Sequence, residues 1–369
     1  MDFPSEIEQI LLRIKKINPS KYAATRNYKN GAVTMLSPYI SRGVISTKQI
    51  VNYILSLNID WCKIEKIIQE LAWRDYWQLI WVNKKNQIFT DLKNPQQNIE
   101  NHKIPDAIIN AETKINAVDE AIKVLYSTGY MHNHMRMYVA SVCCNVAKCH
   151  WLTPAKWLYS NLYDGDIASN HLSWQWVSGT FSNKKYYANQ SNINKYFNSG
   201  QKGTFLDVEY PDFYSMATPN ILKPVSDLKT NCILPSLNDP EIRNIKTLVF
   251  NYYNLDPDWH KNEGFQKVLL LEPSFFEKFP INQNCLDFAI SLSVNLKNIK
   301  LFVGEFQELA QIISFENLFY KEHPTNKHYK GNEENRDWIC EQKGYYPSFF
   351  SFWKKCKKEL KAKINENET

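Results

Sequence analysis

Residues 164–176 read DGDIASNHLSWQW, and this stretch decides how the whole sequence is interpreted. Its polar and aromatic side chains of interest are Asp164, Asp166, Asn170, Trp174 and Trp176. Two carboxylates at this spacing can bind a metal, but the segment lacks the further oxygen ligands of a calcium loop. They can also hold a basic side chain and accept from a ribose or a ring N–H. A turn followed by two core tryptophans explains the same residues, so chemistry alone leaves these interpretations open.

A second cluster, TGYMHNHMRM, occupies residues 128–137. Arg136 lies three residues after Asn133 and four after His132, so the three share one face of a predicted helix. An arginine there can pair with a carboxylate such as Asp164, and an asparagine can donate and accept toward a ligand. His132 and His134 are two residues apart and diverge on a helix, which favours a polar helix start over a metal site.

The third cluster is ELAWRDYW at residues 70–77. Glu70, Trp73 and Arg74 share a helical face because they lie at positions i, i+3 and i+4. A carboxylate, a flat ring and a guanidinium side by side suit a nucleobase, which is bound by stacking and by hydrogen bonds to its edge. The alternative is an amphipathic helix that carries a surface Glu–Arg pair.

The fourth cluster is VTMLSPYISRGVIS at residues 33–46. Hydroxyl groups at Thr34, Ser37 and Ser41 fall just before and inside a predicted helix start. Hydroxyls and free backbone N–H groups at a helix N-terminus bind phosphate well. A Ser-Pro helix start is also common without a ligand, so this cluster has an ordinary structural explanation as well.

The spacing of apolar residues divides the 369-residue chain into a helical part and an α/β part. Residues 1–200 are expected to be helical, residues 201–240 to form a connector rich in Gly and Pro, and residues 241–369 to form a small α/β domain. Helices are predicted at 3–17, 46–57, 64–81, 117–126, 134–148, 154–162, 285–294 and 348–361, and strands at 246–253, 267–273, 299–305 and 316–321. Alternating strands and helices indicate a parallel sheet.

Composition indicates which kind of partner the protein meets, where in the cell it is expected, and whether its cysteines are reduced. Residues 1–200 hold 23 Lys and Arg against 15 Asp and Glu, whereas residues 201–369 hold 21 against 23, so the first part is the one expected to meet a polyanion. No apolar run approaches a membrane span and no secretion signal is evident, which predicts a cytoplasmic protein without membrane contact. Eight irregularly spaced cysteines indicate reduced thiols. Cys143 and Cys144 are adjacent on a helix and diverge, so no iron–sulfur cluster or other metal is expected.

Together, the four clusters resemble the FAD-binding catalytic domain of the photolyase/cryptochrome family. The resemblance covers roughly residues 20–200, and its motifs are long and occur in the family's order. Residues matching the pattern are Tyr22, Arg26, the segment 34–37, the segment 70–76, the segment 128–137, Trp151 and the segment 164–176. The implied fold is an all-helical, FAD-binding photolyase-type domain in the first 200 residues.

The resemblance implies a role for each flavin-site residue. The residues that would hold the phosphates and ribose of FAD are Tyr22, Thr34, Met35, Leu36 and Ser37. Arg136 and Asp164 would form an ion pair beside the isoalloxazine ring, and Asp166 would contact the polar edge of that ring. Asn170 would lie at the flavin N5, where hydrogen bonds tune the cofactor.

Trp174 and Trp151 match two members of the chain that carries electrons from the surface to the flavin in this family. The third, outermost tryptophan would fall near Asn98, and no tryptophan is present there. Either another aromatic residue replaces it or flavin photoreduction uses a shorter route. Repair itself needs only reduced flavin, so this departure does not bear on the repair reaction.

The resemblance implies a deoxyribodipyrimidine photo-lyase, a carbon–carbon lyase that repairs cyclobutane pyrimidine dimers in UV-damaged DNA. The mechanism would be light-driven electron transfer from reduced FAD to a dimer flipped out of the duplex. Trp73 and Trp176 match the two walls of the dimer cleft, and Glu70 matches the residue that binds the dimer. Members that repair (6-4) photoproducts carry catalytic histidines where this chain has Asn133 and Met137. Arg26 matches a DNA-contacting arginine, but His134 stands where many repair members have another.

Two other functions remain open from the sequence. One is a cryptochrome-like blue-light sensor that binds FAD without repair, and the other is a flavin-free helical scaffold that binds nucleic acid. Family members place an α/β antenna domain before the helical domain, whereas here an α/β segment follows it. We therefore expect a shortened antenna domain that is permuted to the C-terminus, with an unrelated docking domain as the alternative. The antenna chromophore cannot be assigned, and a monomer is expected.

Overall fold

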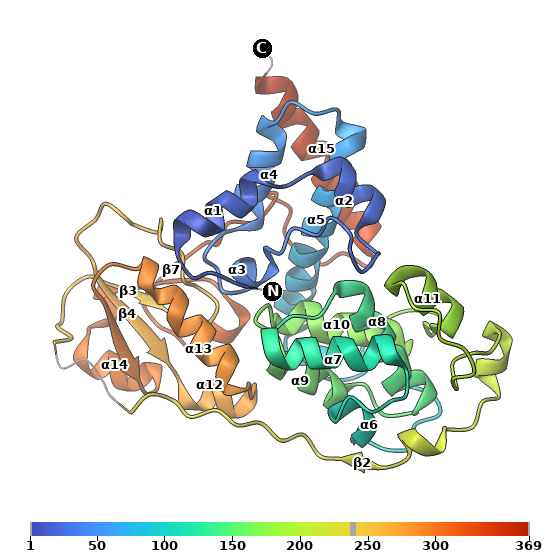
Figure 1. Cartoon of the computed structure of the whole chain (residues 1–369). Helices are drawn as coiled ribbons and strands as arrows, with labels where there is room; N and C mark the ends of the chain where they lie inside the picture. The colour runs from blue at the N-terminus through green and yellow to red at the C-terminus, as the bar shows by residue number, and fades with distance from the viewer. Residues whose placement is uncertain (1, 237–240, 368–369) are drawn as a thin grey trace. The chain divides into compact units, whose positions relative to one another are not determined.

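The computed structural model describes residues 2–236 and 241–367, which fall into two compact units (Figure 1). Unit 1 contains residues 20–33 and 84–230, and unit 2 contains residues 2–19, 34–83 and the described residues from 231 onward. Each unit is therefore assembled from separate stretches of sequence. The expected boundaries at 1–200, 201–240 and 241–369 follow the chain instead, and they stay a prediction.

Unit 1 is almost entirely helical. Its elements are α2 (Pro19–Thr25), η1 (Lys85–Phe89), β1 (Ile104–Pro105), α6 (Asp106–Ile109), α7 (Asn116–Thr128), α8 (Asn133–Ser141), η2 (Val142–Val146), α9 (Leu152–Asn161), α10 (Ile167–Ser178), α11 (Gln190–Phe197), η3 (Tyr210–Tyr214), η4 (Asn220–Leu222) and β2 (Val225–Ser226). The helices predicted at 117–126 and 154–162 are confirmed. The one predicted at 134–148 is α-helical to Ser141 and continues as the π-helical turn η2.

Unit 2 combines helices with a parallel sheet. Its elements are α1 (Ile7–Lys15), α3 (Ser37–Ser41), α4 (Thr47–Ser56), α5 (Trp61–Lys84), β3 (Thr247–Phe250), β4 (Gln266–Leu271), α12 (Pro273–Lys278), α13 (Gln283–Leu292), η5 (Ser293–Asn295), β5 (Ile299–Val303), α14 (Phe306–Ile312), η6 (Phe315–Asn317), β6 (Leu318–Lys321), η7 (Pro324–Asn326), β7 (Asn332–Glu334) and α15 (Phe349–Asn367). The strand order is β5-β4-β3-β6-β7, and all neighbours are parallel. The predicted parallel sheet is confirmed, and β7 is an addition that the sequence pattern did not predict.

The strand order of the sheet changes direction at β3, which is the first strand of the sheet in the sequence. Strands β4 and β5 extend it on one side, and β6 and β7 extend it on the other, so the carboxyl ends of β3 and β6 flank the topological switch point. A cavity beside these ends is lined by residues that include Asn251, Tyr252, Glu272, Asn326 and Tyr329, and its volume is about 10 Å³. This is room for one water molecule. Side chains of the domain itself fill the crevice where open α/β sheets usually bind ligands.

Helices near the N-terminus belong to the same compact unit as the sheet. The guanidinium of Arg42, just after α3, lies over the ring of Tyr252 at 3.6 Å and is fully buried. Gly43 approaches the backbone of Tyr253 so closely that a Cβ atom would come within 2.5 Å of its carbonyl oxygen. These contacts fasten the α3 segment to the chain that leaves β3. No helix in the described parts of the chain is long and apolar enough to cross a membrane.

Candidate functional site

The turn before α10 buries two carboxylates of the DGD motif in unit 1. The side chain of Asp166 caps α10 by accepting a hydrogen bond from the backbone N–H of Ser169 at 2.7 Å. Asp164, whose side chain is 4% exposed, accepts from Nη2 of Arg136 at 2.9 Å. The interpretation as a turn before two core tryptophans holds for Trp174, which is buried, and is wrong for Trp176, which is 39% exposed.

Arg136 is held by two hydrogen bonds that fix its orientation. Its Nε donates to the carbonyl of Met131 at 2.8 Å, and its Nη2 donates to Asp164. The turn that leads into α8 depends on Gly129, which has φ of 66° and ends α7. A Cβ atom at Gly129 would lie 2.1 Å from the ring of Tyr163, so glycine is required there. The Arg–carboxylate pairing that the sequence predicts is present.

Asn170 lies one turn after Asp166, so both side chains project from the same face of α10. Its amide Nδ2 donates to the carbonyl of Ala155 at 2.8 Å. This bond fixes the plane of the amide and directs the carbonyl oxygen the other way, as an acceptor. A fixed acceptor suits a ring N–H, which is the role that the resemblance implies for Asn170.

One polar atom in these segments tests whether a polar ligand fits here. The Oγ of Ser169 is buried and has no hydrogen-bond partner among the residues that the structure describes. Buried polar groups are rarely left unsatisfied, so such atoms mark places where a ligand or water completes the structure. Burial and the nearby charges of His134 and Arg136 lower the pKa of His132 to about 4, which keeps it neutral. The residues of unit 1 therefore fit a polar ligand such as a flavin.

The segment predicted to bind phosphate lies in unit 2. Met35 has φ of 56°, an uncommon value for a residue with a side chain, and the backbone N–H of Leu36 donates to Oγ1 of Thr34 at 3.4 Å. Ser37 begins α3, and no side chain caps that helix. The backbone N–H groups of Tyr39 and Ile40 already donate to the carbonyl of Leu36, and Pro38 has no N–H, so this turn offers few backbone donors to a phosphate. Tyr22, the remaining residue of this predicted set, lies half-buried on α2 of unit 1.

The third cluster lies on α5 of unit 2. Glu70 forms an ion pair with Lys66 at 2.8 Å, and Nη2 of Arg74 donates to Oγ of Ser41 at 2.6 Å. The ring of Trp73 is stacked on Phe349 of α15, with centroids 3.7 Å apart and planes inclined by 9°. Sequence reasoning missed Phe349, because only tertiary structure brings α15 to α5.

The remaining predicted residues lie on unit 1 in different surroundings. Asn133 is exposed at the first turn of α8, and Met137 is half-buried against the core. Trp176 is the exposed tryptophan of α10 and contacts the ring of Tyr186 at 5.8 Å. Arg26 donates from Nη1 to the carbonyl of Ala23 at 3.1 Å.

His134 is packed in an aromatic cluster. Its ring lies 4.6 Å from those of Tyr138 and Tyr196, and its Nδ1 is 3.0 Å from the carbonyl oxygen of Asn27. Burial is the main cause that lowers the pKa of His134, so the residue is neutral at pH 7. It therefore does not supply the positive charge that the family's arginine carries at this position.

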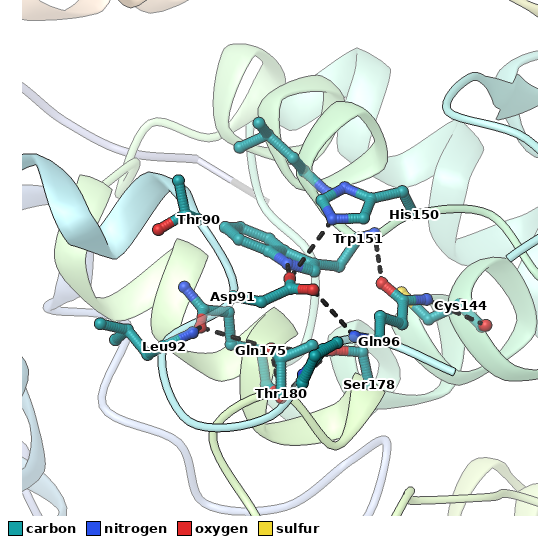
Figure 2. A network of polar contacts seen from close by, with 12 residues as sticks. Thr90, Asp91, Leu92, Gln96, Cys144, His150, Trp151, Gln175, Ser178 and Thr180 are labelled. Carbon is teal, nitrogen blue, oxygen red and sulfur yellow. Dashed lines mark hydrogen bonds and ion pairs between the residues drawn. The ribbon is translucent and has the colours of Figure 1, made fainter. Parts of the chain in front are cut away.

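Trp174 and Trp151 are both buried in the core of unit 1, at 2% and 0% exposure. Figure 2 shows that the indole of Trp151 meets a polar network, in which its Nε1 donates to Asp91 at 2.7 Å. Sequence reasoning missed Asp91, which falls in a stretch that reads as polar and irregular. Asn98, where the third tryptophan was sought, is an exposed residue with φ of 61°.

Within residues 2–236 and 241–367, no group of three or more His, Cys, Asp or Glu side chains is arranged to hold a metal ion. Cys143, Cys144 and Cys149 are fully buried, and burial raises the pKa of each thiol. They are therefore protonated thiols in the core.

A buried histidine on α10 makes the stability of the fold sensitive to acid. Burial lowers the pKa of His171 from 6.5 to about 4, and its Nδ1 donates to the carbonyl of Ile167 at 2.9 Å. The ring of His171 is neutral in the folded protein. Its contribution to the free energy of unfolding is therefore complete above pH 6.5 and is lost as the pH falls from 6.5 toward 4. The shift corresponds to about 3 kcal/mol in the free energy of unfolding.

We therefore expect His171→Phe to reduce the fall in the unfolding free energy between pH 6.5 and 4, measured by urea denaturation at several pH values. His132 titrates in the same range, so part of the acid sensitivity remains. The exposed His102→Gln variant is the control and should match the wild type. An unchanged pH slope in His171→Phe would show that His171 is not neutral in the folded protein.

Comparison with known proteins gives one family for this region. Residues 67–233 match the family described as the FAD binding domain of DNA photolyase. The deoxyribodipyrimidine photo-lyase of Buchnera aphidicola subsp. Baizongia pistaciae is 27% identical over 237 residues, which are 62% of this chain and 48% of the relative. The mitochondrial deoxyribodipyrimidine photo-lyase of Saccharomyces cerevisiae is 30% identical over 47% of this chain and 34% of the relative.

The chain spans about a third to a half of the length of the curated relatives it matches. Among solved structures, a cryptochrome from a Synechocystis species is similar with a TM-score of 0.48 and 24% identity, over 61% of this chain and 49% of that one. The matched region contains the predicted site residues from Glu70 to Trp176. Tyr22, Arg26 and the segment 34–37 lie before it.

Proposed function

This chain belongs to the photolyase/cryptochrome family and has FAD as its cofactor, and from this premise we propose that it uses light to repair cyclobutane pyrimidine dimers in UV-damaged DNA. The observation that carries the proposal is the set of fixed polar groups formed by Arg136, Asp164, Asp166 and Asn170 within the matched region. A scaffold that only binds nucleic acid has no use for such a set. Bound FAD supplies the electron that light drives to the dimer.

The residues of unit 1 bind and orient the ring system in this proposal. Arg136 and Asp164 form a fixed ion pair beside the ring, and the positive charge favours a reduced, negatively charged cofactor. The carbonyl oxygen of Asn170 accepts from a ring N–H, because its amide nitrogen is already bound to Ala155. Asp166 combines its capping of α10 with contact to the polar edge of the ring. Tyr22 and residues 34–37 bind the phosphates and ribose.

Five further side chains bind the pyrimidine dimer. Trp73 and Trp176 stack on the flipped dimer, Glu70 holds it by a hydrogen bond, and Asn133 and Met137 flank it. The net reaction opens the cyclobutane ring and consumes no electrons. Arg26 binds the DNA backbone. Residues 20–33 and 84–230 together hold 18 Lys and Arg against 12 Asp and Glu, so affinity for DNA should fall with rising salt.

The second candidate is a blue-light sensor that binds FAD without repair. Two observations favour it: the neutral His134 stands in place of a DNA-binding arginine, and one face of Trp73 is covered by Phe349. The two candidates share the flavin site and differ in the chemistry on DNA. Loss of dimers therefore separates them.

The α/β segment that follows the helical segment is proposed to be an antenna-like domain. The parallel order β5-β4-β3-β6-β7 supports this, since a non-parallel sheet would contradict it. An unrelated docking domain is the alternative. The cavity at the switch point has a volume of about 10 Å³ and is lined by residues that include Tyr252.

The deciding experiment is blue-light repair of an oligonucleotide that contains a thymine dimer. The full chain is loaded with FAD and reduced chemically, and a dark sample is the control. We expect dimer loss only in the light. If the flavin is bound and no dimers are lost, the sensor replaces the enzyme as the proposed function.

A variant of the exposed tryptophan tests the cleft. Trp176→Ala is expected to weaken binding of dimer-containing DNA by about 5- to 150-fold, because stacking of a base on an aromatic side chain contributes about 1–3 kcal/mol. Trp176 is 39% exposed, so the fold should tolerate the change. Tyr214→Ala removes a ring that is 77% exposed on the same unit and is the matched control. Equal affinities of the two variants would remove Trp176 from the DNA site.

A further inference from the structure

The buried indole of Trp151 donates a hydrogen bond to the carboxylate of Asp91. The other polar groups in contact with this carboxylate are also hydrogen-bond donors. Oδ1 of Asp91 accepts from Nε1 of Trp151 at 2.7 Å and lies 3.3 Å from Nε2 of His150, and Oδ2 accepts from the backbone N–H of Gln96 at 2.8 Å (Figure 2). Trp151 is fully buried, whereas the carboxylate of Asp91 is 22% exposed. The carboxylate therefore connects a buried indole with the edge of the unit.

The tautomer of His150 follows from its second nitrogen. The backbone N–H of Leu152 donates to Nδ1 of His150 at 3.3 Å, so Nδ1 carries a lone pair. Burial is the main cause that lowers the pKa of His150, and the ring is neutral at pH 7. The ring proton is therefore on Nε2, facing Asp91. The indole, the imidazole and the backbone N–H of Gln96 all donate toward the carboxylate oxygens of Asp91.

The loop that carries Asp91 is fastened to α10 on one side. The side chain of Gln175, next to Trp174, accepts from the backbone N–H of Leu92 at 3.1 Å and donates to the carbonyl of Ile88 at 2.8 Å. The backbone N–H groups of Lys93 and Asn94 donate to the carbonyl of Thr180. These bonds hold the backbone on both sides of Asp91.

The same loop is also fastened to the Trp151 backbone. The side chain of Gln96 accepts from the backbone N–H of Trp151 at 2.9 Å and donates to the carbonyl of Cys149 at 2.8 Å. Asp91 and Trp151 are thus parts of one rigid arrangement, in which the indole and carboxylate cannot separate without breaking several bonds. Such positioning is what transfer of a proton between two groups requires.

A route leads from Asp91 to solvent. The ring of His150 is stacked on that of His102, with centroids 4.9 Å apart and planes inclined by 26°. His102 is exposed. A proton taken up by Asp91 can pass directly to water, because the carboxylate is 22% exposed, whereas His150 already carries its own proton on the nitrogen that faces Asp91.

We propose that Asp91 accepts the indole proton of Trp151 and thereby makes Trp151 the last electron donor of a two-tryptophan chain. One-electron oxidation makes an indole N–H strongly acidic, because loss of the proton removes the positive charge. Trp151 gives one electron, by way of Trp174, to light-excited oxidised FAD, and gives its N–H proton to Asp91. A neutral tryptophanyl radical remains. A soluble thiolate later supplies one electron to it, and Asp91 returns the proton to the indole nitrogen. The outer tryptophan that is missing near Asn98 is then not needed.

This inference rests on the flavin site of the proposed function, and Asp91 acts in it as the proton acceptor. The test uses the FAD-loaded full chain, excited by a blue flash, and follows the absorption of the tryptophan radical. In the wild type we expect a deprotonated radical that forms more slowly in D₂O. In Asp91→Asn the deprotonation should slow by about 100-fold, a typical contribution of a positioned proton acceptor. Return of the electron from the flavin to oxidised Trp151 then competes with deprotonation, and the yield of reduced FAD falls.

Two variants control the flash experiment. Glu100→Gln removes a carboxylate from the same loop that pairs with Lys148 at 2.8 Å on the surface, and should behave as the wild type. Trp151→Phe should abolish the deprotonated radical. If Asp91→Asn does not fold, the isotope effect in the wild type decides, since it needs no substitution.

A readout without light or flavin chemistry tests the contact itself. In protein labelled with ¹⁵N-tryptophan, the indole N–H signal that disappears in Trp151→Phe belongs to Trp151. It should shift in Asp91→Asn and stay in place in Glu100→Gln. An indole N–H signal of Trp151 that does not shift in Asp91→Asn would overturn the proposed contact.

Repair by chemically reduced protein separates this inference from the proposed function. Asp91→Asn should repair dimers at the wild-type rate once FAD is reduced by dithionite, because Asp91 acts only in photoreduction. Absence of repair in every sample, together with the expected radical behaviour, would overturn the repair function and support this inference. A radical that deprotonates equally fast in Asp91→Asn, or a wild type without a Trp151 radical, would overturn the inference.

Discussion

Replacing Asp164 with alanine is expected to destabilise the protein by about 3–5 kcal/mol and to abolish retention of FAD. Removing one partner of a buried ion pair leaves an uncompensated charge in a poorly solvated place. The side chain of Asp164 is 4% exposed and that of Arg136 is 20% exposed, so water replaces the lost carboxylate poorly. The free energy of unfolding is measured by urea denaturation, and bound flavin by absorbance after gel filtration.

Two variants show whether burial is the cause of this loss. Asp164→Asn keeps an acceptor for Nη2 of Arg136 and should be less destabilised than Asp164→Ala. Glu120→Ala breaks an exposed ion pair with Lys29 in the same unit and should cost less than about 1 kcal/mol. If Asp164→Ala and Glu120→Ala lose the same stability, the buried pair does not hold this turn. Loss of stability with full retention of FAD would place the flavin elsewhere.

Replacing Phe349 with alanine is expected to cost about 3–5 kcal/mol, the usual range for removing a buried phenylalanine. Phe349 is 3% exposed and lies between two parallel rings, Trp73 at 3.7 Å and Trp353 at 6.3 Å between centroids. Its removal opens a cavity between α5 and α15 and frees one face of Trp73. The free energy of unfolding measures the first effect, and the tryptophan fluorescence of the folded protein measures the second.

The next residue provides a matched control for this prediction. Phe350 is 67% exposed on the same helix, so Phe350→Ala should change the free energy of unfolding by less than about 0.5 kcal/mol. Phe349→Leu keeps most of the volume and should lose less stability than Phe349→Ala. A loss below about 1 kcal/mol in Phe349→Ala would show that α15 is not packed on Trp73 in solution.

Much of the candidate site could be read from the sequence because it is local. The DGD turn, its capping of α10 and the position of Asn170 depend on neighbours within four residues. The glycine of the TGYM motif likewise marks the backbone turn that ends α7. Apolar runs also predicted the parallel sheet correctly, since buried strands need continuous apolar residues. The short strand β7, with no apolar residue, gave no such signal.

Contacts between distant segments could not be predicted from local patterns. Asp91 lies in a polar loop 60 residues before Trp151, and nothing in its neighbours marks it as an indole acceptor. Phe349 is one of several phenylalanines in a C-terminal run, and only the packing of α15 on α5 selects it as the residue that covers Trp73. The discontinuous composition of the two compact units was likewise hidden, since helical periodicity does not say which core a helix joins.

Local motifs in the sequence predicted the resemblance to a flavin-binding domain, because their side chains interact within one or two turns of backbone. Tertiary structure decided which groups surround those side chains: the carboxylate at Trp151, the ring on Trp73, and the aromatic cluster that keeps His134 neutral. The physical reason is the range of the interactions. Hydrogen bonds along a helix or turn are specified by sequence spacing, whereas burial, stacking and desolvation depend on segments that meet only when the chain has folded.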